Sequence, residues 1–181
     1  MGLRTSKTEK NIRNAFIELR SKKTIEKISI KELTELASVN KSTFYRHYTD
    51  IYALSENIED DLVESCMEMV AGPDKLLEKE GILSLINALD AQSNIFNIIF
   101  SDSRKDAAIH KIHYRFMKKL LAQHPEYQDD MEKKIMLTTL TYGMVQSYRI
   151  YSDLGVSRDT ILNSFVKLNQ GLSNEEKTSE S

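Results

Sequence analysis

The chain has 181 residues, a formal net charge of -2, one cysteine, and only 6 glycines and 2 prolines. Its length allows one full-sized domain, or a large domain with a small module attached, and either can bury a core. The lone Cys66 excludes an intrachain disulfide, and the scarcity of glycine and proline favours long helices over a sheet with many turns. No stretch has the roughly 18 uncharged apolar residues of a membrane span, and the first ten residues lack the apolar core of a signal peptide. We therefore expect a cytoplasmic protein with no membrane partner.

Charge is distributed unevenly along the chain. Residues 1–50 carry 11 Lys or Arg against 6 Asp or Glu, whereas residues 51–181 carry 14 against 21. A basic head on an acidic body is typical of a small nucleic-acid reader joined to a separate domain, although the same surplus also fits an ordinary solvated face. The pattern predicts a DNA-binding head at 1–50, a helical body at 51–172, and a polar, disordered tail at 173–181.

The first predicted helix begins at an N-cap on Thr8 and ends near Ser21. Its apolar residues recur at helical spacing and form one stripe: Ile12, Ala15, Phe16 and Leu19. Arg13 and Arg20 are expected on or beyond the other faces of this helix.

Two short helices are predicted next. Ser29 with Glu32 three residues later has the spacing of a capping box, so a helix is expected from there to about Ala37. A turn at Ser38 follows, and Asn40 can cap a helix of about two turns over the segment KSTFYRHY.

Long amphipathic helices are predicted for the rest of the chain. The first starts at Asp50 and ends near Val70, before Gly72-Pro73, with these residues facing inward: Ile51, Leu54, Ile58, Leu62, Cys66 and Met69. Further helices are expected at 75–90, 92–101, 104–123, 129–153 and 157–171, with caps at Asp74, Ser103 and Ser157 and breaks at His124-Pro125 and Gly155. No segment alternates with a period of two, so the predicted fold class is all-α.

Two short helices joined by a tight turn, with basic and hydroxyl residues at the start of the second, form a helix-turn-helix pattern. Apolar residues are expected to fix the angle between these helices: Leu33, Leu36, Ala37, Val39, Phe44 and Tyr48. Lys31, Lys41 and Ser42 are placed to reach base edges in a major groove, and Thr43, Tyr45 and His47 can donate to phosphates. The predicted DNA-binding set is Lys31, Asn40, Lys41, Ser42, Thr43, Tyr45, Arg46 and His47. The alternative is that these are ordinary surface side chains.

The stretch SIKELTELASVNKSTFYRHYTD resembles the DNA-binding segment of the TetR/AcrR family of one-component regulators, whose usual form is close to T-x-x-x-I-A-x-x-A-G-V-S-x-x-T-L-Y-x-H-F. Matching positions are Ser29, Leu33, Ala37, Val39, Thr43, Phe44, Tyr45, His47 and Tyr48. The resemblance covers about residues 8–54. It extends more loosely to YGMVQSYRIYSDLGVSRDTI, which is similar to the family's penultimate helix, turn and last helix.

Four positions depart from the family pattern. Thr34 replaces an Ala at a packed helix crossing, where its hydroxyl is expected to bond the carbonyl one turn earlier. Ser38 replaces the turn Gly and has to accept the backbone strain of that position. Asn40 replaces Ser, with equal capping ability. Ile51 stands where the family often has a Lys that contacts a phosphate, and the candidates to compensate are Arg46, Lys41 or the N-terminal Arg4 and Lys7.

The resemblance implies a homodimeric repressor with an N-terminal three-helix DNA-binding domain and a C-terminal helical ligand-binding and dimerisation domain. A small-molecule effector would then be held between body helices, and the candidate contacts are Asn94, Asn97, His110, His113, Tyr114, Tyr142, Gln146 and Arg149. Alternatively, these side chains face solvent or bond one another. His110 and His113 lie on one helical face, but no Cys or carboxylate completes a metal site, so we expect neither a metal nor a cofactor.

The same resemblance implies that helices 129–153 and 157–171 pack against their symmetry mates as a four-helix bundle. Apolar residues offered for that interface are Leu137, Leu140, Met144, Val145, Tyr148, Tyr151, Ile161, Phe165 and Leu168, and Gly143 would permit a close approach. No Gly-rich phosphate loop, HExxH or nucleophile pattern is present, so an enzyme is not expected. A ligand-free or coactivator-bound regulator and a helical protein-interaction adaptor remain as alternatives.

Overall fold

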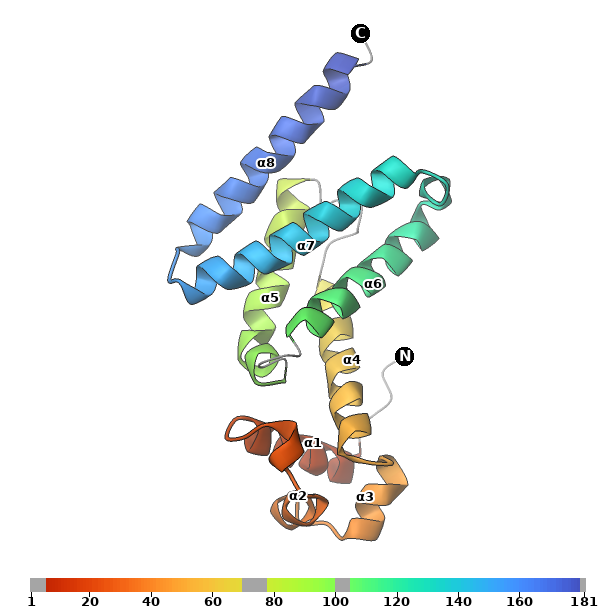
Figure 1. Ribbon diagram of the computed structural model, residues 1–181, viewed down its shortest axis with the longest axis vertical. Coiled ribbons are helices and arrows are strands. Elements are labelled where there is room, and N and C mark those ends of the chain that lie inside the picture. The colour runs from red at the N-terminus through yellow and green to blue at the C-terminus, as the bar shows by residue number, and fades with distance from the viewer. Residues whose placement is uncertain (1–5, 70–77, 100–104, 180–181) are drawn as a thin grey trace. The chain divides into compact units, whose positions relative to one another are not determined.

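The computed structural model describes the backbone of residues 6–69, 78–99 and 105–179, and their side chains except those of 105–108 and 171–179. Every regular element within these ranges is helical, which confirms the predicted all-α class (Figure 1). The elements are α1 (Lys7–Arg20), η1 (Ile25–Lys27), α2 (Ile30–Leu36), α3 (Lys41–His47), α4 (Ile51–Met69), α5 (Lys79–Ile99), α6 (Lys105–Gln123), η4 (Pro125–Tyr127), α7 (Met131–Asp153) and α8 (Arg158–Ser179). The caps predicted at Asp74 and Ser103 lie outside the described residues.

The chain forms two compact units. The first contains α1 to α3, α4 up to Leu62, and the end of α5 from Ser93; the second contains α4 from Val63, α5 up to Gln92, and α6 to α8. Helices α4 and α5 therefore contribute residues to both units. The first unit extends beyond residue 50, where the sequence predicted the head to end. None of the described helices is long and apolar enough to cross a membrane.

The core of the first unit is built on the apolar stripe predicted for α1. Ile12 and Phe16 are fully buried, as are Leu33 of α2 and Phe44 of α3. The N-cap of α1 is Ser6 and not Thr8, because the Ser6 hydroxyl accepts a hydrogen bond from the Glu9 amide at 3.1 Å. The helix therefore begins earlier than predicted.

Helix α4 begins after Asp50, whose Oδ1 accepts a hydrogen bond from the Ala53 amide at 2.8 Å. The residues predicted to face inward are buried, except Met69, which is 43% exposed. Two polar residues, Ser55 and Glu59, are also buried on α4, and the Ser55 hydroxyl donates to the Glu59 carboxylate at 2.9 Å.

Helix α5 replaces the two helices predicted at 75–90 and 92–101. It is continuous over Lys79–Ile99. The predicted break near residue 91 is wrong, because Asp90, Ala91 and Gln92 include no Gly or Pro and alanine is the best helix former.

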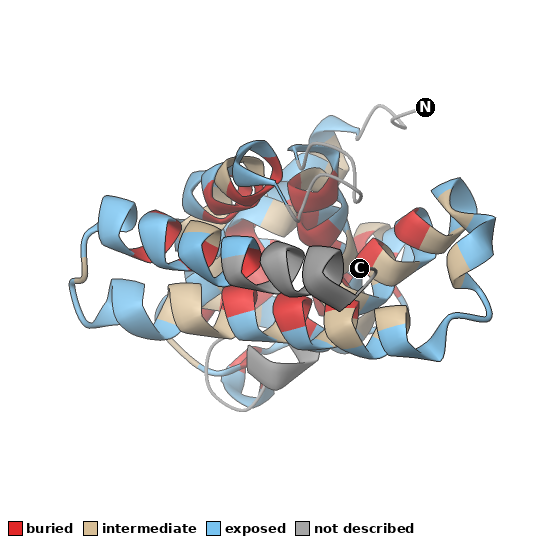
Figure 2. Cartoon of the chain, turned by 90° about the horizontal axis from the view of Figure 1, so that it is seen from above, coloured by how far each residue is buried: buried red, intermediate tan, exposed pale blue. Residues whose placement is uncertain are grey.

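Helices α7 and α8 contact each other in the second unit. The turn between them contains Gly155 with φ +76°, a conformation that favours glycine, and the Ser157 hydroxyl caps α8 by accepting from the Thr160 amide at 3.3 Å. Both features were predicted. Buried residues recur along both helices, with exposed residues between them (Figure 2). Helix α8 continues to Ser179, through most of the segment expected to be disordered.

The apolar residues offered for a dimer interface divide into two groups. Those that line the core of this unit are buried within the chain: Leu137, Leu140, Met144, Val145, Ile161 and Phe165. These side chains are buried without a partner chain, so the excess of exposed apolar surface inferred from them is wrong. The others are not buried: Tyr151 and Leu168 remain about half exposed, and Tyr148 is partly exposed. A Cβ added at the exposed Gly143 would meet no atom within 4 Å.

Candidate nucleic-acid interface

The candidate interface is built from α2, the turn that follows, and α3. The N-caps predicted for both helices are confirmed: the Ser29 hydroxyl accepts from the Glu32 amide at 3.2 Å, and Asn40 Oδ1 accepts from the Thr43 amide at 2.7 Å. The Glu32 carboxylate pairs with Lys23 (Nζ to Oε2, 2.5 Å) instead of completing the capping box. Both short helices are thus started by their own side chains.

The turn between the two helices has the hydrogen bonds of a Schellman motif. The Val39 amide donates to the Thr34 carbonyl at 3.0 Å, and the Ser38 amide donates to the Glu35 carbonyl at 3.2 Å. Ser38 has φ +54° and is the one non-glycine residue in the described part of the chain with a positive φ. The strain predicted from the replacement of glycine is confirmed at this position.

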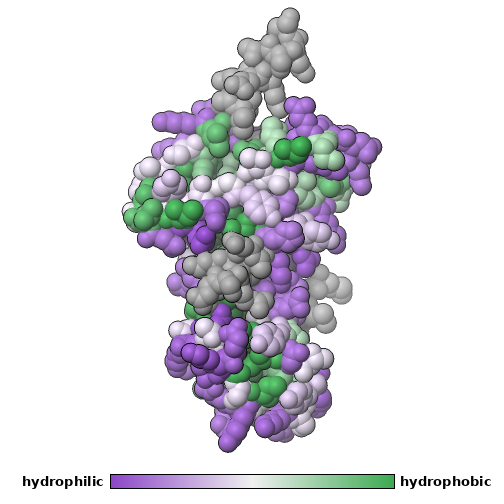
Figure 3. Space-filling view, viewed as in Figure 1, coloured by the Kyte–Doolittle hydropathy of each residue, from purple (hydrophilic) through white to green (hydrophobic). Residues whose placement is uncertain are grey.

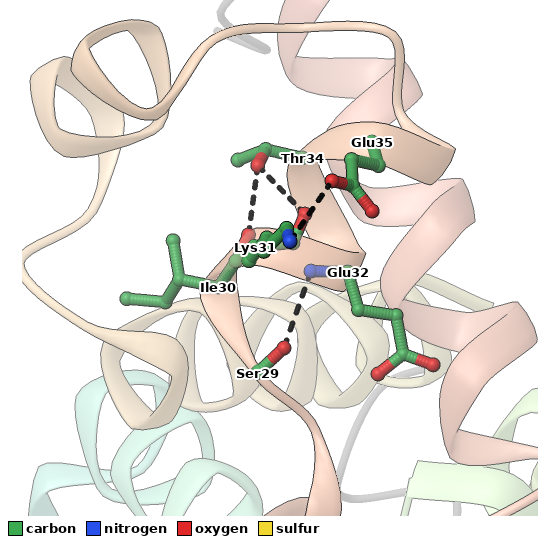
Figure 4. Close-up of polar contacts among 6 residues, drawn as sticks. All are labelled: Ser29, Ile30, Lys31, Glu32, Thr34 and Glu35. Atoms are coloured by element: carbon green, nitrogen blue, oxygen red, sulfur yellow. Dashed lines mark hydrogen bonds and ion pairs between the residues drawn. The ribbon is translucent and has the colours of Figure 1, made fainter.

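Thr34 shows how α2 accommodates a hydroxyl group at a packed crossing. The residue is 3% exposed, and its hydroxyl lies within hydrogen-bond distance of the Ile30 carbonyl at 2.8 Å and the Lys31 carbonyl at 3.0 Å (Figure 4). The predicted bond to the preceding turn is therefore present, and the methyl group is left for apolar packing. Leu36, predicted to pack between the helices, is instead 43% exposed, because it faces outward in the last turn of α2.

Helix α3 has one buried face and one exposed face. Phe44 is fully buried and Tyr48 is 7% exposed, so these two aromatic residues fix the back of the helix. The predicted DNA-binding residues lie on the other face: Asn40, Lys41, Ser42, Tyr45, Arg46 and His47 are exposed and Thr43 is partly exposed. A two-turn helix with a rigid apolar back thus presents a continuous polar surface to solvent.

Hydrogen bonds at the start of α3 orient some of these groups. Asn40 Oδ1 accepts a hydrogen bond from the Ser42 hydroxyl at 2.7 Å as well as one from the backbone. Asn40 therefore orients the Ser42 side chain, and the Ser42 hydroxyl oxygen remains free to accept a hydrogen bond from another group. The Thr43 hydroxyl accepts from Arg46 at 3.3 Å. Lys41 and Arg46 have no ion-pair partner among the described residues, so both retain charge that could be neutralised by an anion.

Lys31 lies on α2 and is also exposed. Its Nζ is 4.0 Å from the Glu35 carboxylate, and both side chains are about 70% exposed (Figure 4). Such a surface pair contributes little, so Lys31 stays available to another anion. In Figure 3, hydrophilic side chains cover much of the surface where Figure 1 places α2 and α3.

Polar contacts behind α3 tie it to neighbouring helices and were not predicted. The Tyr48 hydroxyl donates to the Glu9 carboxylate at 3.3 Å. Arg13 donates to Asn57 Oδ1 at 2.7 Å and pairs with Asp61 at 2.7 Å, so α1 is joined to α4. Burial, followed by the nearby Glu9 carboxylate, raises the pKa of Tyr48 to about 12. No local pattern signals these pairs, because the partners are 39 to 48 residues apart.

A second polar cluster lies between α6 and α7 and includes three of the predicted ligand contacts. His110 Nδ1 is 3.0 Å from the Tyr142 hydroxyl, and the ring centroids of His113 and Tyr142 are 4.9 Å apart. His113 Nε2 is 3.5 Å from the Thr138 hydroxyl, and its buried Nδ1 has no hydrogen-bond partner among the described residues. Burial, with a smaller contribution from His110, lowers the pKa of His113. The cluster is therefore a polar site with an unused nitrogen.

The other predicted ligand contacts do not join this cluster through a side-chain bond. Gln146 accepts two hydrogen bonds from Arg149, at 2.9 and 3.2 Å, and Tyr114 is 59% exposed. Asn94 and Asn97 are exposed on the part of α5 that belongs to the first unit. Within the described ranges, no three His, Cys, Asp or Glu side chains are grouped as a metal site.

An open depression of about 280 Å³ lies in the first unit. Its lining comes from α1, the end of α2 and the turn: Asn11, Asn14, Ala15, Glu18, Leu36, Ala37 and Ser38. None of the predicted DNA-binding residues belongs to this lining.

Comparison with known proteins adds no relative from which a role could be transferred: the sequence matches no protein-family model and has no significant match among curated proteins.

Proposed function

We propose that the protein is a cytoplasmic transcriptional regulator of the TetR/AcrR type, which represses by binding operator DNA through α2 and α3 as a homodimer. One observation carries this proposal: α3 is fixed from behind by Phe44 and Tyr48, and its exposed face presents Lys41 and Arg46, which have no ion-pair partner within the described part of the chain. A short helix with its apolar residues buried and its basic residues exposed is the arrangement that enters a major groove.

The proposed division of labour follows from the chemistry of each side chain. Lys41 and Ser42 lie in the first turn of α3, where base edges are read, and Lys31 on α2 reaches the same groove. Thr43, Tyr45, Arg46 and His47 donate to phosphates, which fix the register of the protein on the duplex. Asn40 caps the helix and orients Ser42. Ile51 is buried, so Lys41 and Arg46 supply the cationic contact that its family counterpart would make.

The proposed dimer uses α7 and α8. Exposed apolar residues on these helices and the turn between them are Met131, Ile135, Ile150, Tyr151, Leu154 and Leu168, with Leu154 71% exposed. A hydrophobic area is visible in Figure 3 where Figure 1 places the turn between α7 and α8. Two copies joined there would present two α3 helices to a near-palindromic operator, with half-sites about 34–36 Å apart.

The proposed effector is a small molecule that contacts the cluster of His110, His113 and Tyr142. His110 Nδ1 lies 3.0 Å from the Tyr142 hydroxyl, and the ring centroids of His113 and Tyr142 are 4.9 Å apart. The unused His113 nitrogen can bond a polar group of a ligand. An effector that binds better to the form released from DNA would shift the population toward that form and lower repression.

The experiment is duplex binding at several salt concentrations, with an operator first selected from random duplexes by the wild-type protein. The test variant is Lys41→Ala with Tyr45→Ala. The matched control is Tyr114→Ala with Lys118→Ala, which removes the same side-chain types from exposed positions four residues apart on α6. We expect tight binding that weakens steeply with salt, a loss of at least tenfold in the test variant, and no change in the control.

Two other outcomes of the duplex-binding experiment would contradict the proposal. Equal losses in both double variants would show that α3 is not the binding surface. Binding of no duplex at any salt concentration would reject the regulator and favour a helical adaptor that uses the exposed apolar residues of α7 and α8.

A further inference from the structure

Arg20, in the last turn of α1, is buried although it carries a full positive charge. It is 6% exposed, whereas the sequence placed it on an outer face of the helix. Its Nη1 donates to the Lys23 carbonyl at 3.1 Å, and its Nη2 lies 3.3 Å from the Ile98 carbonyl and 3.5 Å from the Ile99 carbonyl. One guanidinium thus binds the end of α1 to the end of α5.

The chemistry of a helix end explains this contact. The last four carbonyls of a helix have no partner within it and carry the negative end of its dipole. Helix α5 ends at Ile99, which is fully buried. A buried carbonyl needs a protein donor, and the planar fork of arginine can serve two acceptor groups at once, which the compact ammonium of lysine does less well.

The position of α5 in the chain gives this contact a role beyond packing. Residues 79–92 of α5 belong to the second unit and residues 93–99 to the first. The same helix therefore leads from the proposed effector-binding body to the unit that contains α3. At its other end, α1 holds α3 through Glu9 and Tyr48. Contacts are continuous from α5 through Arg20 and α1 to α3.

We infer that Arg20 is a positioning residue that couples the C-terminal turn of α5 to α1 and α3, so that DNA binding at α3 and the conformation of α5 influence each other. The inference rests on the proposed DNA-binding function. Coupling between two sites is reciprocal, so it can be detected from the DNA side without knowing the effector.

The experiment is hydrogen-deuterium exchange of the full-length protein, with and without the selected duplex. The variants are Arg20→Lys, which keeps the charge, and Arg20→Met, which keeps an apolar stem. The control is Lys22→Met, since Lys22 is exposed and pairs with Glu18 at the surface at 2.8 Å. Circular dichroism verifies the helix content of each variant.

In the wild-type protein and the control, we expect the duplex to slow exchange of the amides of residues 93–99 at least threefold. Both Arg20 variants should bind the duplex within about threefold of wild type and lose that protection. If Arg20 had a purely structural role, its substitution would not remove the amide protection of residues 93–99 while leaving duplex affinity almost unchanged. If Arg20→Met does not fold, Arg20→Lys and the wild-type comparison still decide the matter.

Two results would overturn the inference while leaving the proposed function intact. One is a wild-type protein that binds the duplex with no change at residues 93–99. The other is an Arg20→Lys variant that keeps wild-type protection. If the wild-type protein bound no duplex, the proposed function and the coupling would fall together, and that result is distinct from the first two.

Discussion

The Tyr48 hydroxyl donates a hydrogen bond to the Glu9 carboxylate across 3.3 Å, and this bond joins the C-terminal end of α3 to the first turn of α1. The ring of Tyr48 also packs beside that of Phe44, and the two ring centroids are 5.8 Å apart. The residue therefore holds α3 by both its apolar ring and its polar tip. Substitutions that remove only the tip can separate the two contributions.

We expect Tyr48→Phe to lower the free energy of unfolding by about 1 kcal/mol, the usual net value of a hydrogen bond, while the ring packing remains. Urea denaturation followed by circular dichroism measures the change. Tyr52→Phe is the control, because Tyr52 is 51% exposed. Equal effects of the two substitutions would show that the Glu9 contact adds no stability.

Alkaline pH should weaken the fold through the same residue. The pKa of Tyr48 is raised from 10.0 to about 12, so the unfolded chain loses the proton more readily than the folded protein. The stabilisation is present below pH 10 and is lost as the pH rises from 10 toward 12. Denaturation curves between pH 8 and 11 should show a steeper loss for the wild type than for Tyr48→Phe; parallel losses would contradict the assignment.

The substitution Ser38→Gly should stabilise the protein. Its φ of +54° costs a residue with a Cβ about 1–2 kcal/mol relative to glycine in this region, so Ser38→Gly is expected to raise the melting temperature. Ser38→Val should lower it strongly, because a branched side chain tolerates this conformation least. Ser21→Gly is the control: Ser21 has φ -67°, so glycine there should destabilise. A loss of stability in Ser38→Gly would reject the strain.

Mild acid should destabilise the protein through His113. Burial lowers the pKa of His113 below 6.5, so the unfolded chain takes up a proton that the folded protein resists. Above pH 6.5 the neutral His113 does not reduce the free energy of unfolding. That free energy falls as the pH drops from 6.5 toward the lower pKa of His113 in the folded protein. Between pH 7 and 5, His113→Gln should show a smaller loss than the wild type. His47→Gln, at an exposed position, should keep the wild-type slope, and an unchanged slope in His113→Gln would refute the assignment.

Charged substitutions on α8 and the turn before it should dissociate the proposed dimer. Leu154 and Leu168 are 71% and 53% exposed in the single chain, and burying a carboxylate against an apolar partner is unfavourable. We expect Leu154→Glu and Leu168→Glu to raise the dimer dissociation constant at least tenfold in analytical ultracentrifugation. Leu36→Glu, at an exposed apolar site of the first unit, is the control. A wild-type protein that is monomeric at all concentrations would reject the dimer.

Features that depend on neighbours along the chain could be predicted from the sequence. The caps at Ser29 and Asn40, the bond from Thr34 to the preceding turn, and the strain at Ser38 each involve residues at most five positions apart. The exposure of Lys41, Tyr45 and His47 followed from the apolar spacing of Phe44 and Tyr48. Their role in DNA binding rests on the resemblance and awaits the duplex experiment.

The sequence by itself determined the helical class, the local geometry of α2 and α3, and the polar face of α3, because hydrogen bonds within a turn and apolar periodicity are written in adjacent residues. Only the tertiary structure decided that Arg20 is buried against α5, that Glu9 meets Tyr48, and that Leu137 and Phe165 fill the core of their own chain. The two hydrogen-bonded relationships, Glu9 with Tyr48 and Arg20 with the end of α5, join residues 39 to 79 positions apart. Periodicity indicates which face of a helix is apolar, but the element that covers that face is set by the packing of the whole chain.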